Sequence, residues 1–285
     1  MRTHQVNRIS FRNVSFLIHA IEDDWGVDDV VAAEIRRNSY GEGDALTWWL
    51  AIIANAAPRS TAIDVGAYTG FYSLIAAAAR SDINIVAIEA SVVTFGRLCQ
   101  NILLNKLETR ISPNHVAISD SSGLVKLSHG FGALAMASGE SLEPTYQVDH
   151  TELVPSLSLD ELILQPRDGA VGAIGTKSQS FLPLTGIGGI KIDVEGVEAL
   201  ALKGGLNSLR QFQPPLIIEI LSENSYRDCW ALLEPLGYER IAICHGLNYV
   251  FAASNNKNVI LSSYSKISKR EGGQLLLKNE HAWQY

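Results

Sequence analysis

The chain has 285 residues, of which 47% are hydrophobic and 19% are charged, and its formal net charge is −7. This composition is typical of a globular protein and excludes a disordered, collagen-like or coiled-coil chain. The acidic balance disfavours a nucleic-acid-binding protein, because such proteins need a basic face to neutralise phosphates.

The three cysteines, Cys99, Cys229 and Cys244, are too widely separated to form a C-x-x-C pair or a zinc-ligand spacing. The longest apolar run, residues 46–57, is shorter than the roughly 20 residues that cross a membrane. The N-terminus lacks the apolar stretch of a signal peptide. We therefore expect a cytoplasmic protein without a membrane segment.

The first predicted element is a helix around Trp48 and Trp49, whose apolar neighbours give it one buried face. We expect it to belong to an N-terminal helical cap over residues 1–59. After it, short apolar runs alternate with helical patterns, which indicates an α/β core over residues 60–254. The predicted core strands are 62–65, 85–88, 116–118, 190–193, 216–220, 241–244 and 249–252.

Two segments interrupt this alternation. Residues 124–159 contain short alternating stretches and are predicted to form an inserted hairpin, with a helical turn at 159–162. Residues 165–189 have no periodicity, and a loop of this length is usually either functional or disordered. Residues 255–285 are interpreted as a C-terminal tail.

The last two predicted strands are separated by only four residues, 245–248, a linker too short for a crossover helix. The final strand should therefore run antiparallel to its predecessor. The predicted fold class is a doubly wound α/β sheet, Rossmann-like and mostly parallel, with one antiparallel strand from a C-terminal hairpin. This arrangement is the signature of class I S-adenosylmethionine-dependent methyltransferases, whereas a dinucleotide dehydrogenase half should keep its strands parallel.

Polar side chains stand where the predicted strands end, and open α/β sheets bind ligands beyond the carboxyl ends of their strands. Burying an acid there is costly unless something binds it, so these residues are candidates for a ligand site. They are Asp64, Glu89, Ser119, Asp193 and Glu219.

The loop after the first strand contains Gly66 and Gly70 but has Tyr68 where a G-x-G-x-x-G motif needs its middle glycine. A pyrophosphate needs close backbone approach at that glycine, so the sequence disfavours NAD. Glu89 ends the next strand, where a carboxylate can accept hydrogen bonds from both ribose hydroxyls of NAD or of S-adenosylmethionine.

At these positions the sequence resembles the FkbM family of methyltransferases, over about residues 40–251. The most specific match is the Lys-x-Asp-x-Glu-Gly-x-Glu run from Lys191 to Glu198. The other matching segments are 63–67 with 70–74, Glu89, Phe95, Leu98, Asn101, 104–105, 116–120 with Gly123, 159–162, Gly204 and 217–219.

The resemblance implies transfer of a methyl group from S-adenosylmethionine to a hydroxyl of a sugar or natural product, as in secondary metabolite biosynthesis. It implies that Glu89 holds the ribose, that Ser119 or Asp120 meets the adenine and that Asp193 faces the methyl-transfer space. Glu42, in the Tyr40–Glu42 step, would contact the cofactor amine. The loop beside the methionine part of the cofactor would be formed by Asp64, Gly66, Ala67 and Gly70.

Two residues of these loops depart from the family, which commonly has Asn at the position of Tyr68 and Pro at that of Ala90. Neither change removes a charged group, so both residues are kept in the predicted cofactor site. A hydroxyl acceptor benefits from a general base, and the candidates are Asp193, Glu195 and Glu219. The Asn/Asp-Pro-Pro-aromatic motif of amino-directed methyltransferases is absent, which favours oxygen as the acceptor.

Several alternatives stay open at this point. Glu89 could serve the N-terminus of the following helix, and Lys191 with Glu198 could form a structural ion pair. No histidine spacing indicates a metal site, so none is expected. The chain could instead be an NAD-dependent oxidoreductase or a catalytically silent methyltransferase-like binding module. The expected partner is a small molecule and not nucleic acid; the oligomeric state is not fixed, and a homodimer is compatible with the sequence.

Overall fold

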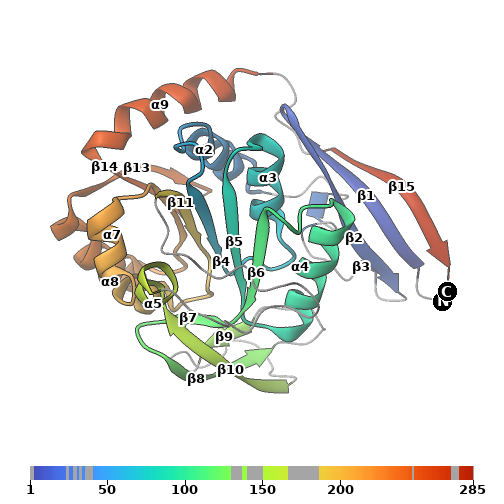
Figure 1. Ribbon diagram of the computed structural model, residues 1–285, viewed down its shortest axis with the longest axis horizontal. Helices are drawn as coiled ribbons and strands as arrows, with labels where there is room; N and C mark the ends of the chain where they lie inside the picture. Colours follow the sequence, from blue (N-terminus) through green and yellow to red (C-terminus); the bar gives the residue numbers. More distant parts are fainter. Residues whose placement is uncertain are drawn as a thin grey trace.

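The computed structural model describes residues 3–23, 26–27, 31, 34–35, 41–129, 137–139, 150–165, 186–245, 247–270 and 276–284. A seven-stranded sheet lies at its centre, in the order β13-β14-β12-β11-β4-β5-β6 (Figure 1). Only β14 runs antiparallel to its neighbours in this sheet. The strands are β4 (Thr61–Val65), β5 (Asn84–Glu89), β6 (Ile111–His115), β11 (Ile187–Ile192), β12 (Leu216–Glu219), β13 (Tyr238–Cys244) and β14 (Asn248–Ala253). The predicted doubly wound sheet with a reversed strand is confirmed.

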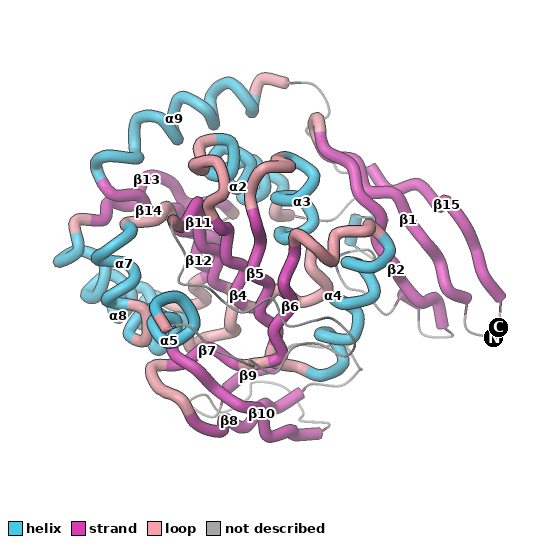
Figure 2. Tube along the Cα trace, viewed as in Figure 1, coloured by secondary structure: helices cyan, strands magenta, loops and turns pink. Residues whose placement is uncertain are grey.

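Helices cover both faces of this sheet (Figure 2). One face packs against α2 (Gly43–Ala54), α3 (Phe71–Ala79), α4 (Val92–Leu104) and α9 (Ser254–Ser268). The other packs against α5 (Leu159–Leu164), α6 (Glu198–Lys203), α7 (Leu206–Phe212) and α8 (Glu223–Leu233), which is followed by the short 3-10 turn η1 (Glu234–Leu236). Two apolar clusters, one on each face, therefore hold the core together. The predicted buried helix around Trp49 is α2, and the helical turn at 159–162 is α5.

The third core strand is not the one predicted. Residues 111–115 form β6 at the edge of the central sheet, whereas Ala117–Ser119 is β7 and pairs in parallel with β10 in a second sheet. The sequence of β6, Ile-Ser-Pro-Asn-His, lacks the apolar run that predicts a core strand. It can still form a strand because an edge strand tolerates polar residues and even a proline such as Pro113.

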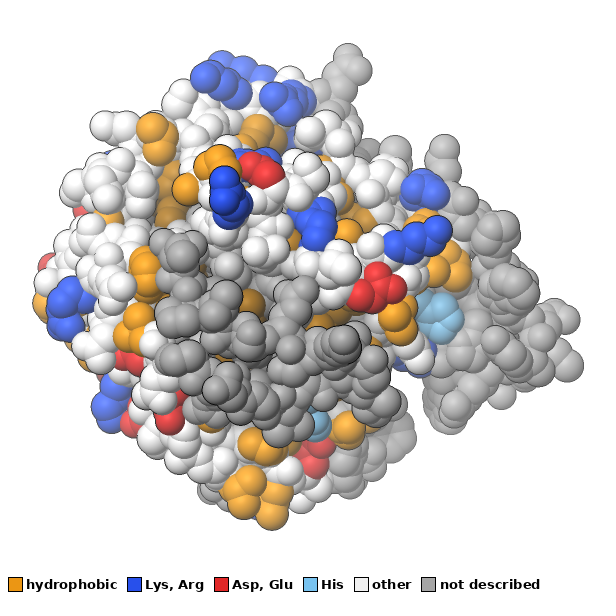
Figure 3. All heavy atoms as spheres, in the orientation of Figure 1, with side chains coloured by type: hydrophobic (Ala, Val, Ile, Leu, Met, Phe, Trp, Pro, Cys, Tyr) orange, Lys and Arg blue, Asp and Glu red, His pale blue; other side chains and the backbone are white. Residues whose placement is uncertain are grey.

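The second sheet has the order β7-β10-β8-β9 and contains the predicted hairpin insertion. Its main pair is β8 (Gly123–His129) with β10 (His150–Ser158), which run antiparallel, and β9 (Ala137–Gly139) lies beside β8. Leu124 and Leu153 on these strands are exposed, and hydrophobic side chains gather at this lower edge of the molecule in Figure 3.

The prediction of an irregular loop over residues 165–189 is wrong at its end, because β11 already begins at Ile187. Residues 166–185 of that loop lie outside the described residues. The start of β11 cannot be recognised from the sequence because it contains Gly188 and Gly189, which are not typical strand residues. A Cβ on Gly189 would lie only 2.5 Å from the side chain of Ile52 in α2, so glycine permits the close approach of helix and strand.

The expected helical cap over residues 1–59 is also wrong in its first half. Three strands, β1 (Thr3–Phe11), β2 (Val14–Asp23) and β3 (Gly26–Val27), form a four-stranded sheet with β15 (Leu276–Gln284), in the order β15-β1-β2-β3. We call it the terminal sheet. Residues 255–285, interpreted as a tail, thus contribute most of α9 and all of β15. Among the helices described, none is both long and apolar enough to cross a membrane.

Candidate functional site

The 66–70 loop joins β4 to α3 and is tightly held by its neighbours. The backbone N–H groups of Gly66 and Ala67 both donate to the carbonyl of Ile88 in β5. A Cβ on Gly66, whose φ is 75°, would lie 1.6 Å from the carbonyl oxygen of Asp193. Gly66 is therefore required by the close packing of this loop against the end of β11, independently of any ligand. Tyr68 follows with a positive φ of 52°.

Asp64 lies beneath this loop, in β4, and is only 1% exposed. Its Oδ2 accepts a 2.6 Å hydrogen bond from the hydroxyl of Ser73 in α3. Burial raises the pKa of Asp64 to about 6, against the opposing effects of Ser73 and Lys191. The structure thus places Asp64 as a support of the loop from below, rather than at its surface.

Glu89, at the end of β5, organises two loops at once. One carboxylate oxygen accepts from the backbone N–H of Tyr68, and the other accepts from the N–H of Ser91 and the hydroxyl of Thr94, each at 2.8 Å. Ser91 immediately precedes α4, so Glu89 also binds the N-terminus of that helix, as the alternative interpretation of this residue expects. A carboxylate offers about four acceptor positions, and with three occupied about one is left for a ribose hydroxyl. Burial raises the pKa of Glu89 to about 7.

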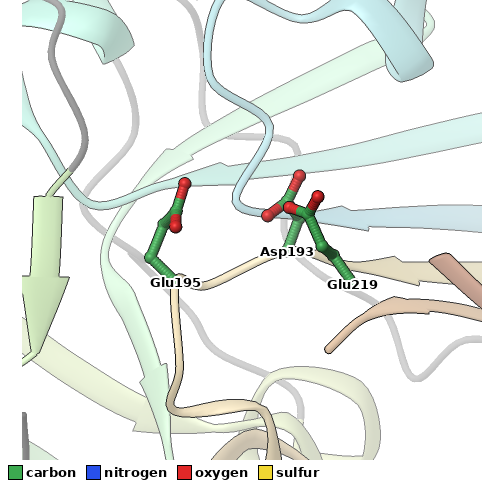
Figure 4. A group of neighbouring side chains, drawn as sticks. All are labelled: Asp193, Glu195 and Glu219. Atoms are coloured by element: carbon green, nitrogen blue, oxygen red, sulfur yellow. The ribbon is translucent and has the colours of Figure 1, made fainter. Parts of the chain in front are cut away.

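The three predicted candidates for the base come together beyond β11 and β12. Asp193, Glu195 and Glu219, which we call the acid cluster, each place a carboxylate oxygen within 4.8 Å of the others. Asp193 and Glu219 point toward one another in Figure 4, and their carboxyl groups are hydrogen-bonded. Two carboxyl groups this close cannot both ionise easily, so the pair shares a proton.

Lys191 decides which member of the pair is ionised. It is 1% exposed, and its Nζ lies 2.8 Å from Oδ2 of Asp193. Burial raises the pKa of Asp193, but the charge of Lys191 and the hydrogen bond from Glu219 outweigh burial and lower it. The pKa of Glu219 is raised by burial and by its hydrogen bond with Asp193. Asp193 is therefore the ionised partner, and 26% of its side chain is exposed.

Glu195 completes the acid cluster from a turn with a positive φ of 53°. Burial and the charge of Asp193 raise the pKa of Glu195 to about 7. Glu198, by contrast, accepts from the N–H of Gly196 and the hydroxyl of Ser225. The predicted ion pair of Lys191 with Glu198 is thus wrong, because Lys191 binds Asp193 instead.

Glu42 approaches the same cluster from the start of α2. Its Oε2 accepts a 2.8 Å hydrogen bond from the hydroxyl of Tyr72, and the ring of Tyr72 lies 4.8 Å from Nζ of Lys191. Burial lowers the pKa of Lys191, but the charges of Asp193, Glu42 and Glu219 outweigh burial and raise it. Tyr40, the first residue of the predicted aromatic step, lies outside the described residues.

The residues expected at the adenine, Ser119 and Asp120, belong to the second sheet and to the turn that follows it. Ser119 ends β7 in the second sheet, where a Cβ on Gly204 would lie 2.1 Å from its carbonyl oxygen. Asp120 forms a 2.8 Å ion pair with Lys203, and 29% of its side chain is exposed. The carbonyl of Ala90 lies 2.9 Å from Nε2 of His115. None of these contacts tests the expected placement of Ser119 or Asp120 at the adenine, which stays a prediction.

The donor and acceptor chemistry of this edge fits an adenosyl sulfonium ligand. Carboxylates at one end suit a cation, and the hydroxyls of Thr69 and Ser91 are buried without a hydrogen-bond partner in the described part of the chain. The acid cluster also has a spacing that could accommodate a metal ion. Lys191 binds one of its oxygens and the pair of Asp193 and Glu219 shares a proton, but neither contact tests for a metal, so the expectation of no metal stays a prediction.

Sequence reasoning missed two contributors to this site. One is the pairing of Lys191 with Asp193, for which the signal is alternation along a strand, since it places residues 191 and 193 on one face. Tyr72 was assigned no role; its position in the first turn of α3, beside the 66–70 loop, is the signal that could have revealed it.

Solved structures of several methyltransferases are among those that resemble this chain. An FkbM methyltransferase from Methylobacillus flagellatus is 15% identical with a TM-score of 0.42, over 68% of this chain and 43% of that one. A precorrin-6y C5,15-methyltransferase from Geobacter metallireducens is 12% identical with a TM-score of 0.41, over 74% and 86%. Fibrillarin from Aeropyrum pernix, which holds natively bound S-adenosyl-L-methionine, is 10% identical with a TM-score of 0.39, over 69% and 67%.

No curated protein sequence matches the chain. The family model described as the methyltransferase FkbM domain, however, matches residues 64–251, which is more than half of it. That region contains the end of β4, all of β5, the 66–70 loop and the whole acid cluster. The chain therefore belongs to the FkbM methyltransferase family, and its cofactor is S-adenosylmethionine.

Proposed function

We propose that this methyltransferase acts on a hydroxyl group of a small molecule, such as a sugar or a secondary metabolite, in the cytoplasm. The observation that carries the proposal is the ionised carboxylate of Asp193, partly exposed beyond β11 and held by Lys191 and Glu219. A hydroxyl oxygen must lose its proton as it is methylated, and an ionised carboxylate is one of the side chains that can receive it.

The proposed reaction divides its tasks among the residues of this edge. S-adenosylmethionine supplies a methyl group on a positively charged sulfur when bound. Asp193 would accept a hydrogen bond from the acceptor hydroxyl, orient it, and take its proton as the oxygen–carbon bond forms and the carbon–sulfur bond breaks, which leaves uncharged S-adenosylhomocysteine. Holding the oxygen at about 3 to 3.5 Å from the methyl carbon accounts for much of the acceleration. Glu195 and Glu42 contribute the negative potential that favours a cation here.

The cofactor assignment has an inexpensive test. A ligand at about 100 times its dissociation constant stabilises the folded state by roughly 2.7 kcal/mol. We expect S-adenosylhomocysteine to raise the melting temperature and NAD to leave it unchanged. Stabilisation by NAD alone would favour the oxidoreductase alternative, and stabilisation by S-adenosylhomocysteine without any turnover would favour a silent binding module.

The acceptor class is tested by incubating the protein with S-adenosylmethionine carrying a ¹³C-labelled methyl group and an extract of small metabolites. We expect a product that has gained the mass of one CH₂ group, with the carbon shift of an oxygen-bound methyl. A label found on nitrogen or carbon would contradict the proposed hydroxyl acceptor.

A further inference from the structure

Two asparagine amides of α4 hydrogen-bond to the terminal sheet, whose apolar residues Ile9, Phe16 and Ile18 also pack into the core on this face. Asn105 accepts from the backbone N–H of Leu17 in β2 and donates to the carbonyl of the same residue, both at 2.7 Å. Asn101, one turn earlier, accepts from the N–H of His19 at 2.7 Å. The two side chains thus satisfy the edge of β2 that is not paired with β1 along this stretch, which an isolated strand would leave exposed.

Asn101 makes a second bond that Asn105 does not. Its Nδ2 donates to the carbonyl of Thr69, at 2.8 Å, inside the 66–70 loop. Asn101 is fully buried, with 0% exposed, so neither bond competes with water. Thr69 follows Tyr68, whose N–H is held by Glu89. One amide therefore joins β2 to the loop that faces the cofactor.

We propose that Asn101 is a positioning residue for the cofactor loop, and that it couples the terminal sheet, outside the matched family region, to S-adenosylmethionine binding. The inference rests on the proposed placement of the cofactor beside the 66–70 loop. Asn101 acts through the backbone of Thr69, because a loop held at only one end would sample other conformations and bind more weakly.

The chain offers a matched pair of variants. In Asn101→Asp the oxygen that accepts from His19 is kept, but the donor to Thr69 is lost. Asn105→Asp, in the same helix, removes the donor to the carbonyls of Leu17 and Asn101 but breaks no hydrogen bond to the 66–70 loop. Both should lower the melting temperature. We expect Asn101→Asp to weaken S-adenosylhomocysteine binding at least tenfold by calorimetry, and Asn105→Asp to change it less than twofold.

Turnover adds a second readout that a purely structural role would not move. Asn101→Asp should raise the KM for S-adenosylmethionine while keeping kcat at saturating cofactor. If Asn101→Asp does not fold, Asn101→Ala and Asn105→Ala replace the pair, with the same expected difference. Equal affinities in the two variants would overturn the coupling. Failure of the unaltered protein to bind S-adenosylhomocysteine would instead overturn the cofactor site itself.

Discussion

Lys191 and Asp193 form an ion pair, with 2.8 Å between Nζ and Oδ2, at the end of the central strand β11; the lysine is buried and the aspartate is partly exposed. Breaking a buried ion pair by removing one partner typically costs about 3–5 kcal/mol, and the partial exposure of Asp193 puts this pair at the lower end of that range. The pair also keeps Asp193 ionised beside Glu219. It therefore connects the stability of the fold to the chemistry proposed for the site.

We expect Lys191→Met to lower the free energy of unfolding by about 3 kcal/mol, measured by urea denaturation. Lys257→Met is the control, because Lys257 forms a 2.5 Å pair with Glu239 that is exposed to solvent. Exposed pairs contribute about 0–1 kcal/mol, so this variant should be nearly neutral. Equal losses in the two variants would contradict the role of Lys191.

Glu89→Gln should weaken cofactor binding at least tenfold, because an amide has one acceptor oxygen where three donors converge on the carboxylate. Leaving buried N–H groups unpaired costs about 1–3 kcal/mol each. Calorimetric titration with S-adenosylhomocysteine measures the loss. Glu108→Gln, at an exposed position, serves as the control. An unchanged affinity in Glu89→Gln would contradict the role of Glu89 in cofactor binding.

The stability of the cofactor-free protein should fall as pH rises from about 4 to about 7. Burial raises the pKa of Asp64 to about 6 and those of Glu89 and Glu195 to about 7. The folded state therefore binds these protons more tightly than the unfolded state, and ionisation removes that stabilisation. Melting curves between about pH 5 and about pH 8 test this, since carboxyls with lowered pKa titrate below that range. A melting temperature that rises across this pH range would contradict the prediction.

The acid cluster should distinguish the charged cofactor from its neutral product. At a pH above 7, where Glu195 is mostly ionised, Glu195→Gln should weaken S-adenosylmethionine binding by about 1 kcal/mol, roughly fivefold. S-adenosylhomocysteine, whose sulfur is uncharged, should be affected less. The ratio of the two dissociation constants is the measurement. An unchanged ratio would mean that the charge of Glu195 does not interact with the sulfonium of the cofactor.

Much of the core could be predicted because buried parallel strands appear as continuous apolar runs. β12 and the β13–β14 hairpin are examples, since their runs and their short linker determine the order and direction of the strands. β6 could not be recognised from its polar edge pattern. The terminal sheet depends on pairing between β1 and β15, at opposite ends of the chain, and a local pattern carries no signal for such a contact.

The site could be predicted only in part, because contacts between elements that are distant in the chain leave no local pattern in the sequence. Carboxylates at strand ends follow from chain position, so the sequence predicts that Asp193 and Glu219 both lie beyond the carboxyl ends of the strands. The hydrogen bonds that distinguish their roles depend on packing between elements. Asp64 turns inward to Ser73, and Glu89 is largely occupied by backbone donors.

The most direct test of the proposed base is the turnover of Asp193→Asn at saturating S-adenosylmethionine and acceptor. An amide cannot receive the hydroxyl proton, so we expect kcat to fall roughly 100- to 10,000-fold. Binding of S-adenosylhomocysteine and the melting temperature, measured on the same sample, report whether the site is otherwise intact. A kcat within about threefold of the unaltered enzyme, well short of the loss expected for a general base, would contradict the assignment of Asp193.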